Sequence, residues 1–125
     1  MKTTIELEID LESIFVTAIE GGSNHWFDVS ETTYETLKNR YPDEPFSIRV
    51  YRNFCDGHVL KVVDAEEPTE EIGVLYKSVA MKSLSKLLQD SDIEISIHNL
   101  VSGYCDACEA DVVFQYMILG ELVYG

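Results

Sequence analysis

The chain has 125 residues and a mass of 14.2 kDa, with 46% hydrophobic and 26% charged residues. These values are typical of one soluble globular domain and exclude disordered and fibrous classes. Asp and Glu number 23 against 9 Lys and Arg, so the formal net charge at pH 7 is −14. Because nucleic-acid-binding proteins neutralise phosphates with clustered Lys and Arg, this balance argues against direct binding to nucleic acid.

No segment has the pattern of a secretion signal or a membrane anchor. The first six residues, Met1 to Glu6, end in an acid where a signal peptide needs an apolar stretch. The longest run without a charged residue, Ile95 to Cys105, has 11 residues, whereas a membrane-spanning helix needs about 20. The cysteine count of three is odd, which argues against a disulfide framework. We therefore expect a cytoplasmic protein in a reducing compartment, with no membrane contact.

The N-terminal residues predict a strand followed by a helix. Residues 5–9 alternate apolar and acidic side chains, which is the period of a half-buried strand. From Leu11 to Ile19 the apolar residues recur with helical spacing. We expect Asp10 to cap this helix and the glycines at 21 and 22 to end it in a left-handed conformation.

The middle of the chain predicts a second helix and then a hairpin. The helix is expected to begin at the N-cap Ser30 and to stop at Pro42. Residues 46–50 alternate apolar and polar side chains, and residues 59–63, which are apolar except for Lys61, are expected to form the return strand. Since Asp56-Gly57 between them favours a tight turn, we expect an antiparallel hairpin.

The C-terminal half predicts one more strand and two helices. Residues 72–76 are expected to form a third antiparallel strand, and Ser78 to cap a helix that runs through Leu88. Residues 93–101 fit both strand alternation and a helical stripe, so this choice stays open. Asp106 is expected to cap a final helix that Gly120 closes. Together the elements predict a single α+β domain over residues 1–125, with a small antiparallel sheet of three to four strands packed with four or five helices.

The acidic residues are unevenly distributed along the chain. No Lys or Arg follows Lys86, whereas the last 39 residues hold seven acids. The segment 64–71 holds five acids in eight residues, namely Asp64, Glu66, Glu67, Glu70 and Glu71. One interpretation is that this charge serves solubility alone. The other is that it forms a surface for a basic partner, because opposite potentials accelerate association.

The cysteines suggest one metal site. Residues 105–108 form a C-x-x-C pattern, and residues 55–58 form a C-x-x-H pattern across the expected hairpin turn. Zinc takes tetrahedral sets of Cys and His, and a tight turn brings ligands three residues apart together. The candidate zinc ligands are Cys55, His58, Cys105 and Cys108. The alternative is that these cysteines are small residues at a helix start and a hairpin end.

The segment Glu20 to Trp26 has the highest density of polar and aromatic side chains. A double glycine allows a sharp helix end and a close backbone approach, while Asn24 and His25 are candidates for gripping a ligand or a partner. The alternative is a plain helix end with Trp26 buried in the core. We expect Trp26 to be buried, with Asn24 or His25 accessible.

Several stretches of the chain resemble a family of small uncharacterised proteins of bacteriophages and prophages. They are Glu20 to Trp26, Val62 to Glu66, Asp106 to Asp111 and the C-terminal Gly120 to Gly125. The resemblance implies an accessory phage protein, early-expressed or counter-defence in type, that acts in the bacterial cytoplasm. It implies no catalytic residue, and the family pattern does not require cysteine at positions 105 and 108.

From these observations we expect a protein that binds a macromolecular partner without turnover. The partner implied by the acidity and the resemblance is a basic or nucleic-acid-handling host protein. An alternative is a small enzyme or ligand-binding domain that uses Glu20, His25 and the carboxylates around Asp64. A second alternative is a structural zinc-binding interaction domain.

Overall fold

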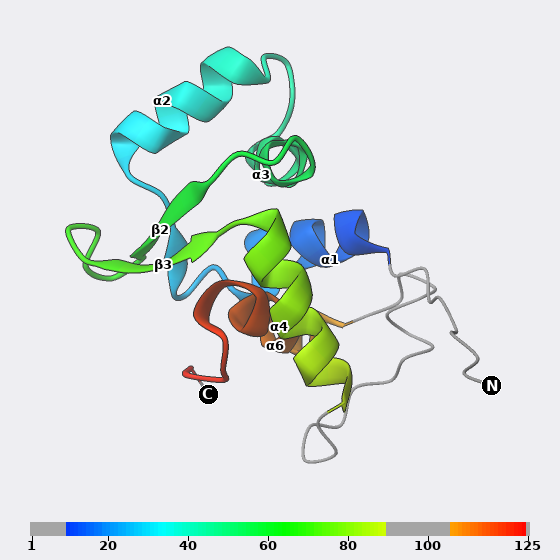
Figure 1. Ribbon diagram of the computed structural model, residues 1–125. Coiled ribbons are helices and arrows are strands. Elements are labelled where there is room, and N and C mark those ends of the chain that lie inside the picture. Colours follow the sequence, from blue (N-terminus) through cyan, green and yellow to red (C-terminus); the bar gives the residue numbers. More distant parts are fainter. Residues whose placement is uncertain (1–9, 90–105, 125) are drawn as a thin grey trace.

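The structure is a computed structural model that describes residues 10–89 and 106–124 (Figure 1). In chain order these residues form α1 (Leu11–Thr17), a π-helical turn η1 (Ala18–Gly22), β1 (Phe27–Asp28), α2 (Glu31–Arg40), α3 (Phe46–Cys55), β2 (Leu60–Asp64), β3 (Glu71–Leu75), α4 (Lys77–Gln89) and α6 (Ala107–Leu119). The five α-helices and three strands of the described residues confirm the predicted α+β class. The predictions for residues 5–9 and 93–101 lie outside them. Among the described helices, none combines the length and apolar character needed to cross a membrane.

The sheet is antiparallel, and β2 is its central strand. Strand β3 pairs with β2 so that Leu60 faces Leu75, which confirms the predicted third strand. The other neighbour of β2 is the two-residue strand β1, in which Phe27 faces Asp64. In Figure 1, β2 and β3 lie between α2 and α3 at the top and α4 and α6 at the bottom.

Helix α6 is the central helix of the core. Its residues 113–118 are all buried, and it contacts α1, η1, β3 and α4. A helix that is apolar on most sides is stable only when other elements cover it. Its ends confirm the prediction: Asp106 and Glu109 form a capping box, and Gly120 closes the helix in a left-handed conformation with φ of 78°.

The predicted strand at residues 46–50 is wrong, because this segment begins helix α3. Phe46, Val50 and Phe54 recur with helical spacing, and the last two are buried. The ring of Phe54 lies 5.0 Å from that of Phe15 in α1. Gly57, with φ of 80°, ends this helix instead of turning a hairpin, and the N–H of His58 reaches back to the carbonyl of the residue at 53.

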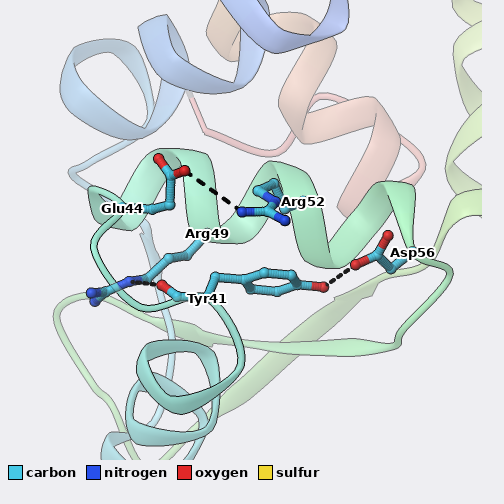
Figure 2. Close-up of polar contacts among 5 residues, drawn as sticks. All are labelled: Tyr41, Glu44, Arg49, Arg52 and Asp56. Carbon is cyan, nitrogen blue, oxygen red and sulfur yellow. Dashed lines mark hydrogen bonds and ion pairs between the residues drawn. The ribbon is translucent and has the colours of Figure 1, made fainter.

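Polar contacts of Tyr41 hold the corner between α2 and α3 (Figure 2). Its buried hydroxyl donates a hydrogen bond of 2.5 Å to Asp56, and its carbonyl accepts one of 2.9 Å from Nε of Arg49. The guanidinium carbon of Arg52 lies 4.9 Å from the centroid of the Tyr41 ring, and Nη1 of Arg52 lies 3.6 Å from Oε1 of Glu44. Burial, followed by the hydrogen bond to Asp56, raises the pKa of Tyr41 to about 12.

Candidate functional site

Segments that are distant in the sequence converge beside the N-terminal half of α6. The loop 20–26 contacts this helix, because η1 packs directly on α6. The carbonyl of Trp26 accepts a 2.9 Å hydrogen bond from the N–H of Ala65, which follows β2. The tail 120–124 folds back onto the same helix through Gln115. These segments therefore form one region of the described structure.

The carboxylate of Asp111 is the centre of this region. Its Oδ1 accepts hydrogen bonds from Oγ of Ser23 at 2.8 Å and from Nε1 of Trp26 at 2.7 Å. Its Oδ2 accepts one from Nε2 of Gln115 at 2.9 Å. Trp26 is 1% exposed, and Ser23 and Gln115 are fully buried. Since buried polar groups need partners, Asp111 satisfies three donors that water does not reach.

Gln115 also fixes the conformation of the C-terminal tail. Its side-chain oxygen accepts hydrogen bonds from the backbone N–H groups of Val123 and Tyr124, at 2.9 and 2.8 Å. Its Nε2 donates a further bond of 3.0 Å to the carbonyl of Tyr124. The Tyr124 ring then stacks on Trp26, with the planes 7° apart and the centroids separated by 5.5 Å. The tail is thus held as part of the folded structure.

The two glycines of this region have different roles. The predicted left-handed helix end is wrong, because neither Gly21 nor Gly22 has a positive φ. Gly22 is instead required by a close approach: a Cβ placed there would lie 2.1 Å from the carbonyl oxygen of Ala107 at the start of α6. A Cβ on Gly21 would meet nothing within 4 Å. Only the second glycine is therefore necessary for packing.

The prediction for the polar residues of the loop is confirmed, because Trp26 is buried while Asn24 and His25 are exposed. The His25 ring approaches Tyr124 edge-on, with centroids 6.4 Å apart. It lines a mostly apolar cleft of about 290 Å³ together with Cys108, Leu122 and Tyr124.

Glu20 does not belong to that cleft. Its carboxylate faces α3, where Oγ of Ser47 donates a bond of 3.4 Å to it. The structure thus separates the Glu20 carboxylate from the His25 ring, although the residues are close in sequence. Asp64 is also used locally, since its carboxylate accepts a 2.8 Å bond from the N–H of Glu66.

The acidic segment 64–71 connects β2 to β3 and lies close to the C-terminal tail. Burial, and after it the charges of Asp64, Glu70 and Glu66, raises the pKa of the Tyr124 hydroxyl. Trp26 places the loop beside the tail, because its carbonyl accepts the hydrogen bond from Ala65 and its ring stacks on Tyr124. Glu67 is exposed, and Glu71 lies 3.6 Å from Lys61 in an exposed ion pair.

The acids after Lys86 have several separate environments. Asp106 and Glu109 form the capping box, and Asp111 belongs to the buried network. Glu121 is exposed in the tail. The remaining acids, Asp90, Asp92 and Glu94, lie outside the described residues.

The candidate zinc ligands lie in two regions of the fold. Cys55 and His58 are exposed at the end of α3 and the loop that follows, and Cys108 is exposed in the first turn of α6. Within residues 10–89 and 106–124, no three His, Cys, Asp or Glu side chains are grouped so as to hold a metal ion. Cys105 lies outside the described residues, so the complete four-ligand set stays a prediction.

No family model, curated protein or solved structure matches this chain. Sequence reasoning did not assign Asp111 or Gln115 to a site, although one signal was present in the sequence. The two residues are four positions apart in an otherwise apolar segment, which places two polar side chains on one face of a buried helix.

Proposed function

We propose that this protein binds a basic macromolecular partner through a surface that we call the acidic end. It consists of the β2–β3 connection 64–71 and the tail 121–124. The observation that carries the proposal is that Trp26 joins the loop to the tail. Its carbonyl accepts a hydrogen bond from the N–H of Ala65, and its ring stacks on Tyr124 in a tail that the Gln115 side chain holds in place. Loop and tail thus meet in one surface.

The charge of the acidic end favours a cationic partner. The segment 64–71 holds five acids, and neither residues 62–76 nor residues 106–124 contain a Lys or Arg. Like charges this close repel one another, and a cationic surface relieves that repulsion. Opposite potentials also steer the encounter and raise the association rate.

Apolar side chains in the tail supply contact area next to the charges. Leu122 is 46% exposed and Val123 is 54% exposed. Because Gln115 binds the backbone of Val123 and Tyr124, these side chains are presented without a large ordering cost on binding. Apolar anchors surrounded by charged groups are the usual composition of a protein interface.

The same surface suits the accessory role that the phage resemblance implies. Host proteins that handle nucleic acid carry basic surfaces for phosphates, and an acidic protein competes for such surfaces by charge. We propose a host protein of this kind as the partner, bound in the bacterial cytoplasm and without turnover.

The test is capture from bacterial lysate followed by binding measurements with the purified partner. The decisive variant replaces Glu66, Glu67 and Glu70 by Gln, which removes three charges from the acidic end. We expect it to bind about tenfold more weakly or worse, mainly through a slower association rate. Raising the salt from about 50 to about 500 mM is expected to slow the association of the native protein in the same way.

A matched control replaces three exposed acids elsewhere, Glu12, Glu31 and Glu35, by Gln. It changes the net charge equally and is expected to bind nearly as well as the native protein. Equal losses in the two variants would show that total charge, and not the acidic end, governs binding. Affinity that is indifferent to salt and to both variants would refute the proposal.

A further inference from the structure

A cleft of about 310 Å³ lies between α2, the end of α3 and the start of β2, and it borders the acidic end where Lys61 pairs with Glu71. Its polar lining comes from Thr33, Thr36 and Arg40 of α2, from Asn53 of α3, and from His58 and Lys61. Strand β2 joins the two regions, because Lys61 is near its first residue and Asp64 is its last. The cleft thus lies at the start of β2 and the connection 64–71 follows at its end; Figure 1 shows the course of this strand.

The charged side chains that line this cleft are opposite in sign to the net charge of the chain. The chain carries 23 acids and a net charge of −14. Among the described residues, the lining of this cleft includes an Arg, a Lys and a His but no Asp or Glu. The carboxylate of Glu71, in the acidic end, lies 3.6 Å from Nζ of Lys61. Because the whole molecule repels anions, only such a local cluster can attract one.

The cleft is preorganised by the buried side chain of Asn53, which is 1% exposed. Its Oδ1 accepts a 2.5 Å hydrogen bond from Nη1 of Arg40, and its Nδ2 donates one of 3.5 Å to the carbonyl of His58. Asn53 therefore orients the guanidinium and the loop together. An arginine has five N–H donors, so the remaining donors are available to a ligand. The contacts of Tyr41 in Figure 2 fix α2 against α3 and hold the walls of the cleft.

We propose that this cleft binds the phosphate group of a small phosphorylated organic molecule. A guanidinium, an ammonium and the hydroxyl of Thr33, which accepts a hydrogen bond from Ser30, match the several acceptor oxygens and the double charge of a phosphate monoester. The hydroxyl of Thr36 donates to the carbonyl of Thr32 and only lines the cleft. The apolar part of the lining, Leu37, Val59 and Leu60, provides contacts for the organic part. The volume is at the small end of the range for ligand pockets, roughly 300 to 1,000 Å³. The exposed ion pair of Lys61 is weak enough to exchange Glu71 for a phosphate.

The test is an NMR titration of the full ¹⁵N-labelled chain at constant ionic strength, with three probes: inorganic phosphate, ribose 5-phosphate and ribose. Ribose 5-phosphate is expected to cause saturable shifts of the amide signals of residues 33–40, 53 and 58–61. Inorganic phosphate is expected to shift the same signals more weakly, and ribose none. An absence of saturable shifts would overturn the site. Inorganic phosphate binding as tightly as the sugar phosphate would overturn the assignment to an organic phosphate.

Two variants with the same charge change separate the cleft from general electrostatics. Lys61→Gln removes a lining ammonium and is expected to weaken ribose 5-phosphate binding about tenfold. Lys38→Gln removes an exposed ammonium of α2 that does not line the cleft, and it is expected to change the affinity by less than about twofold. Equal effects of the two variants would overturn the proposal. Because both lysines are exposed, the circular dichroism of each variant is expected to match that of the native chain.

Discussion

Replacing Asp111 tests whether its carboxylate organises the region shared by the loop 20–26, helix α6 and the tail. Asp111→Ala removes the acceptor of the Ser23 hydroxyl, the Trp26 indole N–H and one N–H of Gln115. Nε2 of Gln115 still donates to the carbonyl of Tyr124, so the donors left without an acceptor are the Ser23 hydroxyl and the Trp26 indole N–H. A buried donor without a partner costs about 1 to 3 kcal/mol. With two such donors, we expect Asp111→Ala to lower the free energy of unfolding by about 2 to 6 kcal/mol.

The asparagine variant separates the acceptor role from side-chain size. In Asp111→Asn the amide oxygen still accepts from Ser23 and Trp26, but the amide nitrogen faces Nε2 of Gln115, which is also a donor. One of the three hydrogen bonds is lost, so we expect a smaller cost of about 1 to 2 kcal/mol. Glu121→Ala removes an exposed carboxylate nearby and is expected to cost less than about 0.5 kcal/mol.

The assay is urea denaturation followed by far-ultraviolet circular dichroism, because the fluorescence of Trp26 reports on the perturbed residue itself. A double-mutant cycle with Trp26→Phe, which removes the indole N–H, is expected to give a coupling energy of about 1 to 2 kcal/mol. A cost below about 1 kcal/mol for Asp111→Ala would refute the reasoning. So would an asparagine variant that is as unstable as the alanine variant.

Three further predictions concern stability. Gly22→Ala is expected to cost at least about 2 kcal/mol in urea denaturation through its backbone clash, whereas Gly21→Ala, with open space around it, changes stability by less than about 1 kcal/mol. Trp26→Ala is expected to cost about 3 to 5 kcal/mol and the exposed His25→Ala under about 0.5, and similar costs for both would contradict the burial pattern. Burial and a hydrogen bond to a carboxylate raise the pKa of Tyr41 from 10.0 to about 12, so the folded state holds this proton more tightly than the unfolded state. The contribution of the protonated Tyr41 hydroxyl to the free energy of unfolding is therefore complete below pH 10 and is lost between pH 10 and 12. Tyr41→Phe is expected to flatten the stability profile across that window, measured by urea denaturation at each pH.

The sequence alone predicted those elements whose signals are local. The final helix followed from Asp106 and Gly120, a cap and a left-handed glycine, and both behave as predicted. The strand 72–76 followed from its β-branched residues and is found at Glu71–Leu75. The helix after it is also found, but it begins at Lys77, before the predicted cap Ser78, and ends at Gln89, one residue after Leu88. Caps and short apolar patterns depend on neighbouring residues, so they can be recognised without knowledge of the fold.

The segment 46–55 shows where local patterns are insufficient. Its residues alternate like a strand over five positions, but Phe46, Val50 and Phe54 also have helical spacing. The helical conformation is favoured because it packs the ring of Phe54 against that of Phe15 in α1. Burial against a distant helix outweighs a strand preference of at most about 1 kcal/mol.

The candidate sites depended still more on tertiary structure. The high density of acids in 64–71 and the burial of Trp26 were predictable from composition and residue type. The acceptor for the Trp26 indole was not, because Asp111 lies 85 residues away in the chain. Nor did any local pattern bring Arg40, Asn53 and Lys61 into one cleft. The sequence by itself determines which groups need partners, since burial and charge are properties of each side chain. Only the folded chain decides which partners meet, because hydrogen bonds and close packing require contact in space.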